Sequence, residues 1–214
     1  MKSFLIIGMS TFGQHLCKEL FLRNSQVMIV DKNEELVERM LPFAVSGKIG
    51  DCTNGEVLAS FGVDEFDTCF VCVGGHFTEG LEITSMLREM GAKKIVSEVN
   101  RDIEAKFLLR NGADSVVYPE KDLAYRIASA EADDSIFDEI TLSDGYSVFE
   151  IKVPKSWCGK TIKELDVRAK YKLSIIATKS NNHLQPMLDP SHVFSKDEHL
   201  LVMGLTDDIK KVIK

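Results

Sequence analysis

The feature that most constrains this chain is a glycine-containing turn between a short apolar run and an amphipathic segment near the N-terminus. Residues 3–7 (Ser-Phe-Leu-Ile-Ile) are typical of a strand that is buried on both faces. The turn, residues 8–13 (Gly-Met-Ser-Thr-Phe-Gly), follows at once, and apolar residues at helical spacing come after it. A second apolar run, residues 26–30, ends at Asp31. Strand, turn, helix, strand and terminal acid form the pattern of a dinucleotide-binding unit, so the chain is expected to begin with a Rossmann-like fold.

Each position of such a unit has a physical task. The first glycine, Gly8, makes the tight turn, the last, Gly13, lets the helix pack closely on the strand, and the start of the helix faces a phosphate. Asp31 follows Gly13 by 18 residues, where a carboxylate can accept hydrogen bonds from ribose hydroxyls. Ser10 stands in place of the middle glycine. Its Cβ should displace a pyrophosphate outward, although its hydroxyl could donate to one. The alternative is a Rossmann-like sheet whose loop binds nothing.

Strands and helices are expected to alternate six times over about the first 130 residues. The expected strands are residues 3–7, 26–30, 44–49, 68–73, 94–97 and 115–118. Such alternation predicts a doubly wound parallel sheet with helices on both faces, in which ligands bind beyond the carboxyl ends of the strands. The candidate ligand contacts therefore follow the strands.

An acidic stretch, residues 132–135, predicts a boundary between two domains. We expect a Rossmann-like domain at residues 1–134 and a small α+β domain at residues 135–214. The expected elements of the second domain are strands at residues 137–142, 146–153, 172–179 and 199–204, a short helix after Gly159 and a last helix at 207–214. A domain of about 75 residues buries a modest core and would gain stability from dimerising.

The bulk composition excludes several classes of protein. A net charge of −7 argues against nucleic acid as a partner, because phosphate binding needs a basic face. We find no signal peptide and no apolar run approaching 18 residues, so direct membrane insertion is not expected. Five cysteines, an odd number, without a secretory signal favour reduced thiols in a cytosol.

The cysteines and histidines carry no clear reactive or metal-binding pattern. Cys69 and Cys72 form a C-x-x-C string, but within a strand their side chains would point to opposite faces, so we expect core packing. Cys52 could be a reactive thiol in a ligand loop, and packing of a small residue is the favoured alternative. The histidines at 183, 192 and 199 show no metal-ligand spacing, and no metal site is expected.

The chain resembles the RCK regulatory proteins of Ktr/Trk potassium uptake systems. The similarity covers essentially the whole chain, and its most specific piece is residues 112–121 (Gly-Ala-Asp-Ser-Val-Val-Tyr-Pro-Glu-Lys). It implies a non-enzymatic, ligand-sensing subunit that is cytoplasmic and peripheral at the inner face of the membrane. Such subunits assemble as dimers into a homo- or hetero-oligomeric ring, an octamer, beneath a membrane potassium channel or transporter subunit.

The resemblance also implies a set of nucleotide contacts. The residues that would face the phosphates are Gly8, Ser10, Thr11, Phe12 and Gly13. The residues that would hold the adenosine are Asp31 at the ribose, Lys32 beside it, and Asp51 and Cys52 at the adenine. The backbone would approach the ligand at Gly74 and Gly75. Glu120 would reach the polyphosphate end across a subunit interface, through a cation; its plain alternative is an acid in the first turn of a helix.

The chain departs from the family pattern at three positions. ATP-binding members carry an arginine where this chain has Thr11, and a lysine after the fifth strand, where Ser97 aligns. Ser10 replaces the middle glycine. Because each missing charge-assisted contact is worth roughly 1.5–3 kcal/mol, NAD(H), AMP or ADP is expected in preference to ATP. Asp31 would repel the 2′-phosphate of NADP, and Lys32 would soften that repulsion.

Three alternatives remain open at this point. An NAD-dependent oxidoreductase would need a proton donor, and the chain has no Tyr-x-x-x-Lys pair. A redox-sensing transcriptional regulator would need a helix-turn-helix or a basic stripe, and neither is visible. In the second domain, Ile175 and Ile176 could line a pocket for cyclic di-AMP, which the resemblance implies for some members, or could form a dimer core.

Overall fold

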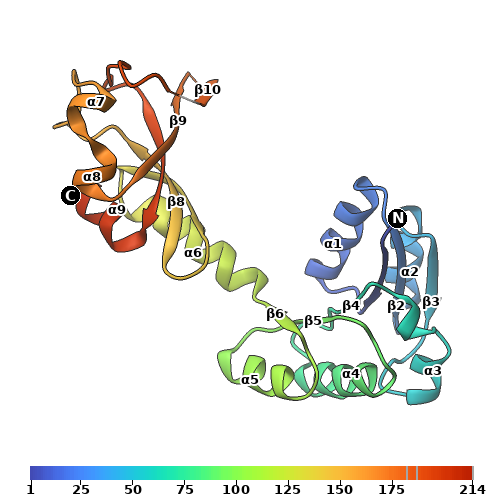
Figure 1. Ribbon diagram of the computed structural model, residues 1–214. Coiled ribbons are helices and arrows are strands. Elements are labelled where there is room, and N and C mark those ends of the chain that lie inside the picture. Colours follow the sequence, from blue (N-terminus) through green and yellow to red (C-terminus); the bar gives the residue numbers. More distant parts are fainter. Residues whose placement is uncertain (182, 187, 214) are drawn as a thin grey trace. The chain divides into compact units, whose positions relative to one another are not determined.

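A computed structural model describes residues 1–181, 183–186 and 188–213 (Figure 1). The chain divides into two compact units, the first ending at Lys121 and the second beginning at Asp122. This division falls inside helix α6 (Pro119–Ala132), whereas the sequence placed the boundary just after that helix. The structure, like the sequence, divides into two units. The predicted domain boundary between residues 134 and 135 stays a prediction.

The first unit contains a six-stranded sheet in the order β3-β2-β1-β4-β5-β6, and all of its neighbouring strands are parallel. Its strands are β1 (Ser3–Ile7), β2 (Gln26–Asp31), β3 (Ser46–Ile49), β4 (Thr68–Val71), β5 (Ile95–Glu98) and β6 (Ser115–Val117). The chain moves outward from β1 to β3 and then returns to place β4 on the other side of β1. This reversal is the switch point at which ligands bind in such sheets. The predicted doubly wound parallel sheet is confirmed.

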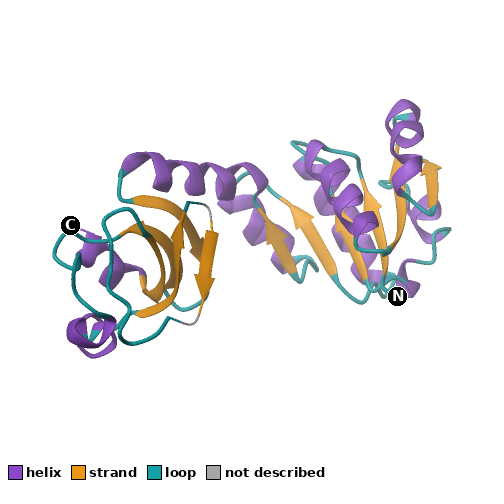
Figure 2. Ribbon diagram, turned by 90° about the horizontal axis from the view of Figure 1, so that it is seen from above, coloured by secondary structure: helices purple, strands orange, loops and turns teal. Residues whose placement is uncertain are grey.

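Helices connect successive strands of this unit and lie in layers beside the sheet (Figure 2). They are α1 (Thr11–Leu22), α2 (Glu34–Met40), α3 (Gly55–Ala59), α4 (Phe77–Glu89) and α5 (Asp102–Arg110), with short 3-10 turns at Leu41–Phe43 and Val63–Glu65. Asn33 caps α2 by accepting the N–H of Leu36 at 3.3 Å. Gly91, with φ +84°, follows the end of α4, as expected of a glycine after a helix.

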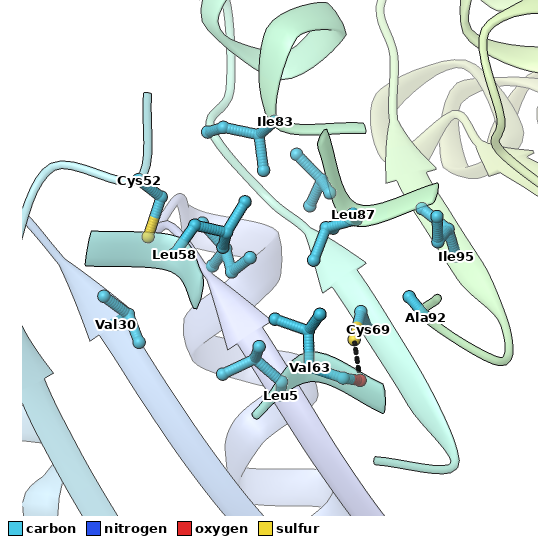
Figure 3. Packing of buried hydrophobic residues seen from close by; sticks show 12 residues of the cluster. Leu5, Val30, Cys52, Leu58, Val63, Cys69, Ile83, Leu87, Ala92 and Ile95 are labelled. Carbon is cyan, nitrogen blue, oxygen red and sulfur yellow. Dashed lines mark hydrogen bonds between the residues drawn. The ribbon is translucent and has the colours of Figure 1, made fainter. Parts of the chain in front are cut away.

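Two of the apolar clusters in this unit pack on opposite faces of the central strands. Figure 3 shows the cluster that packs the central strands against α3 and α4, with Leu5, Leu58 and Leu87 among its members. The second cluster includes Ile6 and packs against α1 and α2. Consecutive residues of β1 therefore enter opposite cores. Cys69 belongs to the first cluster and Cys72 to the second, which confirms that the C-x-x-C string is packing.

The second unit contains a five-stranded antiparallel sheet in the order β10-β9-β11-β8-β7. Its elements are β7 (Ile136–Thr141), β8 (Tyr146–Lys152), α7 (Ile162–Leu165), α8 (Val167–Tyr171), β9 (Ser174–Ser180), β10 (His183–Pro186), β11 (His199–Leu205) and α9 (Thr206–Ile213). Trp157, only 1% exposed, packs near Tyr171 and Phe194 at the centre of its core. The predicted α+β fold of this region is confirmed.

Two short elements of the second unit were not expected from the sequence. Strand β10 is exposed along its whole length and ends in proline, so it lacks the apolar alternation that marks a strand. Helix α8 has five residues and begins directly after α7, where Asp166 adopts φ +46°. Five residues are too few to establish a helical period in a sequence. Among the described residues, no helix is both long and apolar enough to cross a bilayer.

Candidate functional site

The turn after β1 can be built only with glycine at its two ends. Gly8 has φ +87°, and a Cβ there would lie 2.4 Å from the carbonyl oxygen of Cys72. A Cβ on Gly13 would lie 2.7 Å from the carbonyl oxygen of Gly8, because α1 starts directly against the turn. Both distances are far below any real contact. The two glycines thus let the first turn of α1 approach the carboxyl ends of β1 and β4.

A crevice with a cavity of about 230 Å³ lies at the carboxyl ends of β1, β2 and β4. Six of the expected contact residues line it: Gly8, Ser10, Asp31, Lys32, Asp51 and Cys52. Residues that the sequence did not single out as ligand contacts also line it, including Met9, Leu36, Val73 and Glu79. The other six expected contacts are outside this lining: Thr11, Phe12, Gly13, Gly74, Gly75 and Glu120. The structure therefore gathers the expected adenosine contacts more closely than the expected phosphate contacts.

The Asp31 carboxylate is fixed in place by two backbone amides. Its Oδ2 accepts the N–H of Met9 at 2.6 Å, and its Oδ1 accepts the N–H of Asn33 at 2.8 Å. Each carboxylate oxygen can accept more than one hydrogen bond. Asp31 is thus oriented by the glycine turn and still has lone pairs for two hydroxyl donors, which is the chemistry a ribose requires.

An ion pair lies at the edge of the crevice, between β2 and α4. The Lys32 Nζ contacts both carboxylate oxygens of Glu79, at 3.0 and 3.1 Å, and this hydrogen bond raises the pKa of Lys32. The Nδ1 of His76 lies 3.7 Å from the same carboxylate. Glu79 was not among the ligand contacts expected from the sequence. Its signal was position alone, in the first turn of the helix that follows the expected Gly74-Gly75 loop.

The two residues expected at the adenine pocket behave differently. Asp51 is exposed, and its carboxylate accepts both the hydroxyl and the N–H of Thr53, which lowers its pKa. Cys52 is buried, with 4% exposure, and burial raises the pKa of its thiol to about 12. A thiol that stays protonated is a poor nucleophile. The structure therefore favours packing over a reactive thiol for Cys52.

Ser10 connects the start of α1 to a carboxylate that the sequence analysis missed. It caps α1 by accepting the N–H of Gly13 at 3.1 Å, and its hydroxyl donates to Oε2 of Glu98 at 2.7 Å. Burial raises the pKa of Glu98, hydrogen bonds from Ser10 and from the N–H of Gly74 oppose this, and the charge of Glu120 adds to it. The Ser10 hydroxyl, expected as a possible phosphate donor, is thus already bound to a carboxylate.

Ser97 does not lie where the family alignment placed it relative to the strand. Strand β5 continues through Glu98, and the Ser97 side chain is buried and 2.9 Å from the hydroxyl of Thr84 on α4. The expected end of the strand at residue 97 was therefore wrong by one position. Adjacent residues of a strand point to opposite faces of the sheet. With β5 ending at Glu98, the Glu98 side chain, and not that of Ser97, contacts the start of α1.

The remaining expected contacts are placed as follows. Thr11 is exposed at the first position of α1, while the Phe12 side chain packs against the apolar cluster beside α1. Gly74 has φ +64°, and a Cβ added to it would lie 3.7 Å from the Ser10 Cβ. A Cβ on Gly75 would meet nothing within 4 Å. Glu120 is exposed at the start of α6. Their roles toward a nucleotide stay predictions.

Comparison with known protein families decides the assignment. The TrkA-N domain model matches residues 4–119, and the TrkA-C domain model matches residues 148–214. The chain belongs to the TrkA-N/TrkA-C family. The resemblance to RCK regulatory proteins is thereby confirmed. Within this family, the chain is 32% identical over 213 residues to the Ktr system potassium uptake protein C of Bacillus subtilis (strain 168), covering 100% of this chain and 96% of that protein. It is also 32% identical over 210 residues to the Ktr system potassium uptake protein A of the same organism, covering 98% and 95%.

Solved structures share the fold at lower identity. The GsuK channel bound to NAD superposes with a TM-score of 0.71 and 20% identity over 100% of this chain, which spans 39% of that channel. The AMP-bound form of the Shewanella denitrificans Kef CTD gives a TM-score of 0.52 and 21% identity over 61% of this chain and 79% of that one. These matches establish the architecture of this TrkA-N/TrkA-C protein.

Proposed function

We propose that this protein is a nucleotide-sensing regulatory subunit that gates a potassium channel or transporter, without catalytic activity of its own. The observation that carries the proposal is the crevice at the switch point, where Asp31 is oriented by the glycine turn and faces a cavity. The full-length relatives are potassium uptake proteins, which supplies the system being regulated.

The geometry supports an adenine nucleotide or NAD(H) as the ligand. Asp31 offers acceptors to ribose hydroxyls, and the apolar side chains of Leu36, Val73 and Ile83 line the same cavity and suit a flat base. A negatively charged Asp31 would repel a phosphate on the 2′-hydroxyl. AMP, ADP and NAD(H) therefore fit better than NADP. Two of the fold relatives are complexes with NAD and AMP, in agreement with this ligand class.

The ligand would act by shifting populations. A nucleotide that binds one arrangement of the subunits more tightly than another favours that arrangement, and coupling of this kind is typically about 1–3 kcal/mol. Helix α6 is the proposed place of exchange between subunits. None of its described residues is buried, and Leu123, Tyr125 and Ile127 are each about half exposed on it. Dimers joined in this way would build the ring, which would lie at the cytoplasmic face of the membrane against its channel subunit.

Reconstitution tests this function directly. The protein is combined with the membrane subunit of its potassium uptake system in liposomes, and potassium flux is measured with NAD⁺, NADH, AMP, ADP and ATP in turn. We expect flux to depend both on the protein and on at least one nucleotide. Flux that ignores both, or robust turnover of NADH with carbonyl substrates by the protein alone, would contradict the proposal.

A further inference from the structure

The carboxylate of Glu98 lies where an anion is expected to bind. In dinucleotide-binding units the start of the first helix faces a phosphate, because its unpaired N–H groups and its dipole favour negative charge. Here the serine that caps α1 donates to Glu98 at 2.7 Å, and the N–H of Gly74 bonds the same carboxylate. A side chain of the protein therefore already occupies part of the favourable field at the start of α1.

The side-chain charges described beside the start of α1 are negative. Glu120, at the start of α6, is close enough to Glu98 to influence its ionisation electrostatically. Among the described residues that line the crevice, Lys32 carries the one permanent positive charge, and it is paired with Glu79 at 3.0 Å beside Asp31. The cation thus lies beside Asp31, whereas the Glu98 carboxylate lies at the start of α1, outside the crevice lining, and is influenced by the charge of Glu120.

We propose that Glu98 is a specificity-determining residue that limits the negative charge the crevice accepts. The preferred ligand is an adenine nucleotide with few phosphates, or a dinucleotide whose diphosphate is followed by a neutral or cationic group, as in NAD⁺. This inference rests on the proposed nucleotide-sensing function. Each further phosphate of ADP and ATP would extend toward Glu98 and Glu120, and like charges within a few ångströms oppose one another strongly when partly buried.

A titration series separates the effect of charge from that of the adenosine. AMP, ADP and ATP share one adenosine and differ only in phosphate number. Calorimetric titration of the full chain without divalent cations should give a dissociation constant that rises from AMP to ATP by about tenfold or more. NAD⁺ should bind about as tightly as AMP. The substitution Glu98→Gln keeps the shape and the acceptor for Ser10 while removing the charge, and it should narrow the AMP-to-ATP ratio to about threefold or less.

Two further variants serve as controls for the Glu98→Gln substitution. Glu98→Ala should narrow the same ratio, which keeps the test usable if the glutamine variant does not fold. Glu82→Gln removes one exposed carboxylate from α4, outside the crevice lining, and should leave the ratio as it is in the unmodified protein. If Glu82→Gln narrows the AMP-to-ATP ratio as much as Glu98→Gln does, the effect comes from the net charge of the protein, and the proposed role of Glu98 is overturned.

The remaining outcomes are distinguishable. If no nucleotide binds the unmodified protein or any variant, the proposed nucleotide-sensing function itself fails. If nucleotides bind and Glu98→Gln leaves their ratios unaltered, the function stands and the inference is overturned. Repeating the titrations with Mg²⁺ adds one more arm. If ATP becomes the tightest ligand with Mg²⁺ and loses that advantage in Glu98→Gln, Glu98 binds a cation together with the nucleotide. This result would also overturn the inference.

Discussion

Glu150 in the second unit and the crevice-end carboxylates Asp31 and Glu98 in the first unit are held in different ways. In the second unit, Glu150 on β8 accepts from the Lys179 ammonium at 2.9 Å and contacts the Nδ1 of His199 at 2.9 Å. In the first unit, Asp31 and Glu98 are held by backbone N–H groups and a hydroxyl. The Glu150 carboxylate is paired with cationic side chains of its own sheet, while the groups that hold Asp31 and Glu98 are neutral.

The pKa values of Glu150 and Glu98 are shifted in opposite directions. Burial alone would raise the pKa of Glu150, but hydrogen bonds from His199 and Lys179 lower it overall. Burial raises the pKa of Glu98, and its hydrogen bonds do not reverse that shift. Glu150, paired with side-chain cations, thus stabilises its own sheet, whereas Asp31, held by amides at a strand end, retains acceptor capacity toward the crevice.

The largest effect is expected in the first unit, from Gly8→Ala. Its Cβ would lie 2.4 Å from the Cys72 carbonyl oxygen at a positive φ, so we expect a loss of about 3 kcal/mol or more in the free energy of unfolding. Urea denaturation followed by circular dichroism measures this. The single tryptophan, Trp157, reports on the second unit, and its fluorescence transition should move much less.

Gly75→Ala is the matched control for this substitution. A Cβ there meets nothing within 4 Å, so the change in stability should stay within about 0.5 kcal/mol. Equal losses in the two variants would mean that the turn is not the constrained point of the first unit.

A smaller effect is expected in the second unit, from Glu150→Gln. The substitution replaces the carboxylate beside Lys179 and His199 with a neutral amide that has a single acceptor oxygen, which should cost about 1–3 kcal/mol, read from the Trp157 fluorescence transition. A shift in the circular dichroism transition without a shift in the Trp157 fluorescence transition would contradict this assignment of Glu150 to the stability of the second unit.

The pH dependence of that transition has a defined sign. Because the folded-state pKa of Glu150 is lowered, its contribution is present above the unfolded pKa of about 4.3 and is lost as the pH falls through the folded value. The unmodified protein should therefore lose stability in acid more steeply than Glu150→Gln. Parallel pH profiles would show that the ion cluster does not stabilise the folded state.

The smallest effect concerns the thiols. Burial raises the pKa of Cys52 to about 12, so its thiolate fraction at pH 7.5 should be lower than that of an ordinary thiol by roughly three powers of ten. Iodoacetamide labelling followed by mass spectrometry should modify the half-buried Cys158 of the second unit well before Cys52. Labelling of Cys52 as early as Cys158 would indicate that the Cys52 thiol is accessible to solvent, contrary to its burial in the structure.

The sequence predicts the first unit well because its signals are local. Apolar runs bounded by glycine mark the strands, and α1 follows the glycine turn, where apolar residues recur at helical spacing. The glycine turn and Asp31 are separated by a fixed distance along the chain, so their proximity could be anticipated. In the second unit, β10 has no apolar alternation and α8 has too few residues for a period, and both escape such reasoning.

The missed site residues depend on contacts between distant parts of the chain. Ser10 and Glu98 are 88 residues apart, and Lys32 and Glu79 are 47 apart. Which of residues 97 and 98 faces the start of α1 depends on where β5 ends, and a shift of one residue exchanges the two faces. No local pattern in the sequence fixes that register, whereas the pairing of β5 with β4 and β6 does.

The central claim is that an adenine nucleotide is held at the switch point by Asp31. Calorimetric titration of AMP and NAD⁺ into the unmodified chain, Asp31→Ala and Glu150→Gln tests it most directly. Losing charge-assisted hydrogen bonds to the ribose should weaken binding by about ten- to a hundredfold in Asp31→Ala, while Glu150→Gln should bind as the unmodified protein does. Equal affinities in all three proteins would contradict the account.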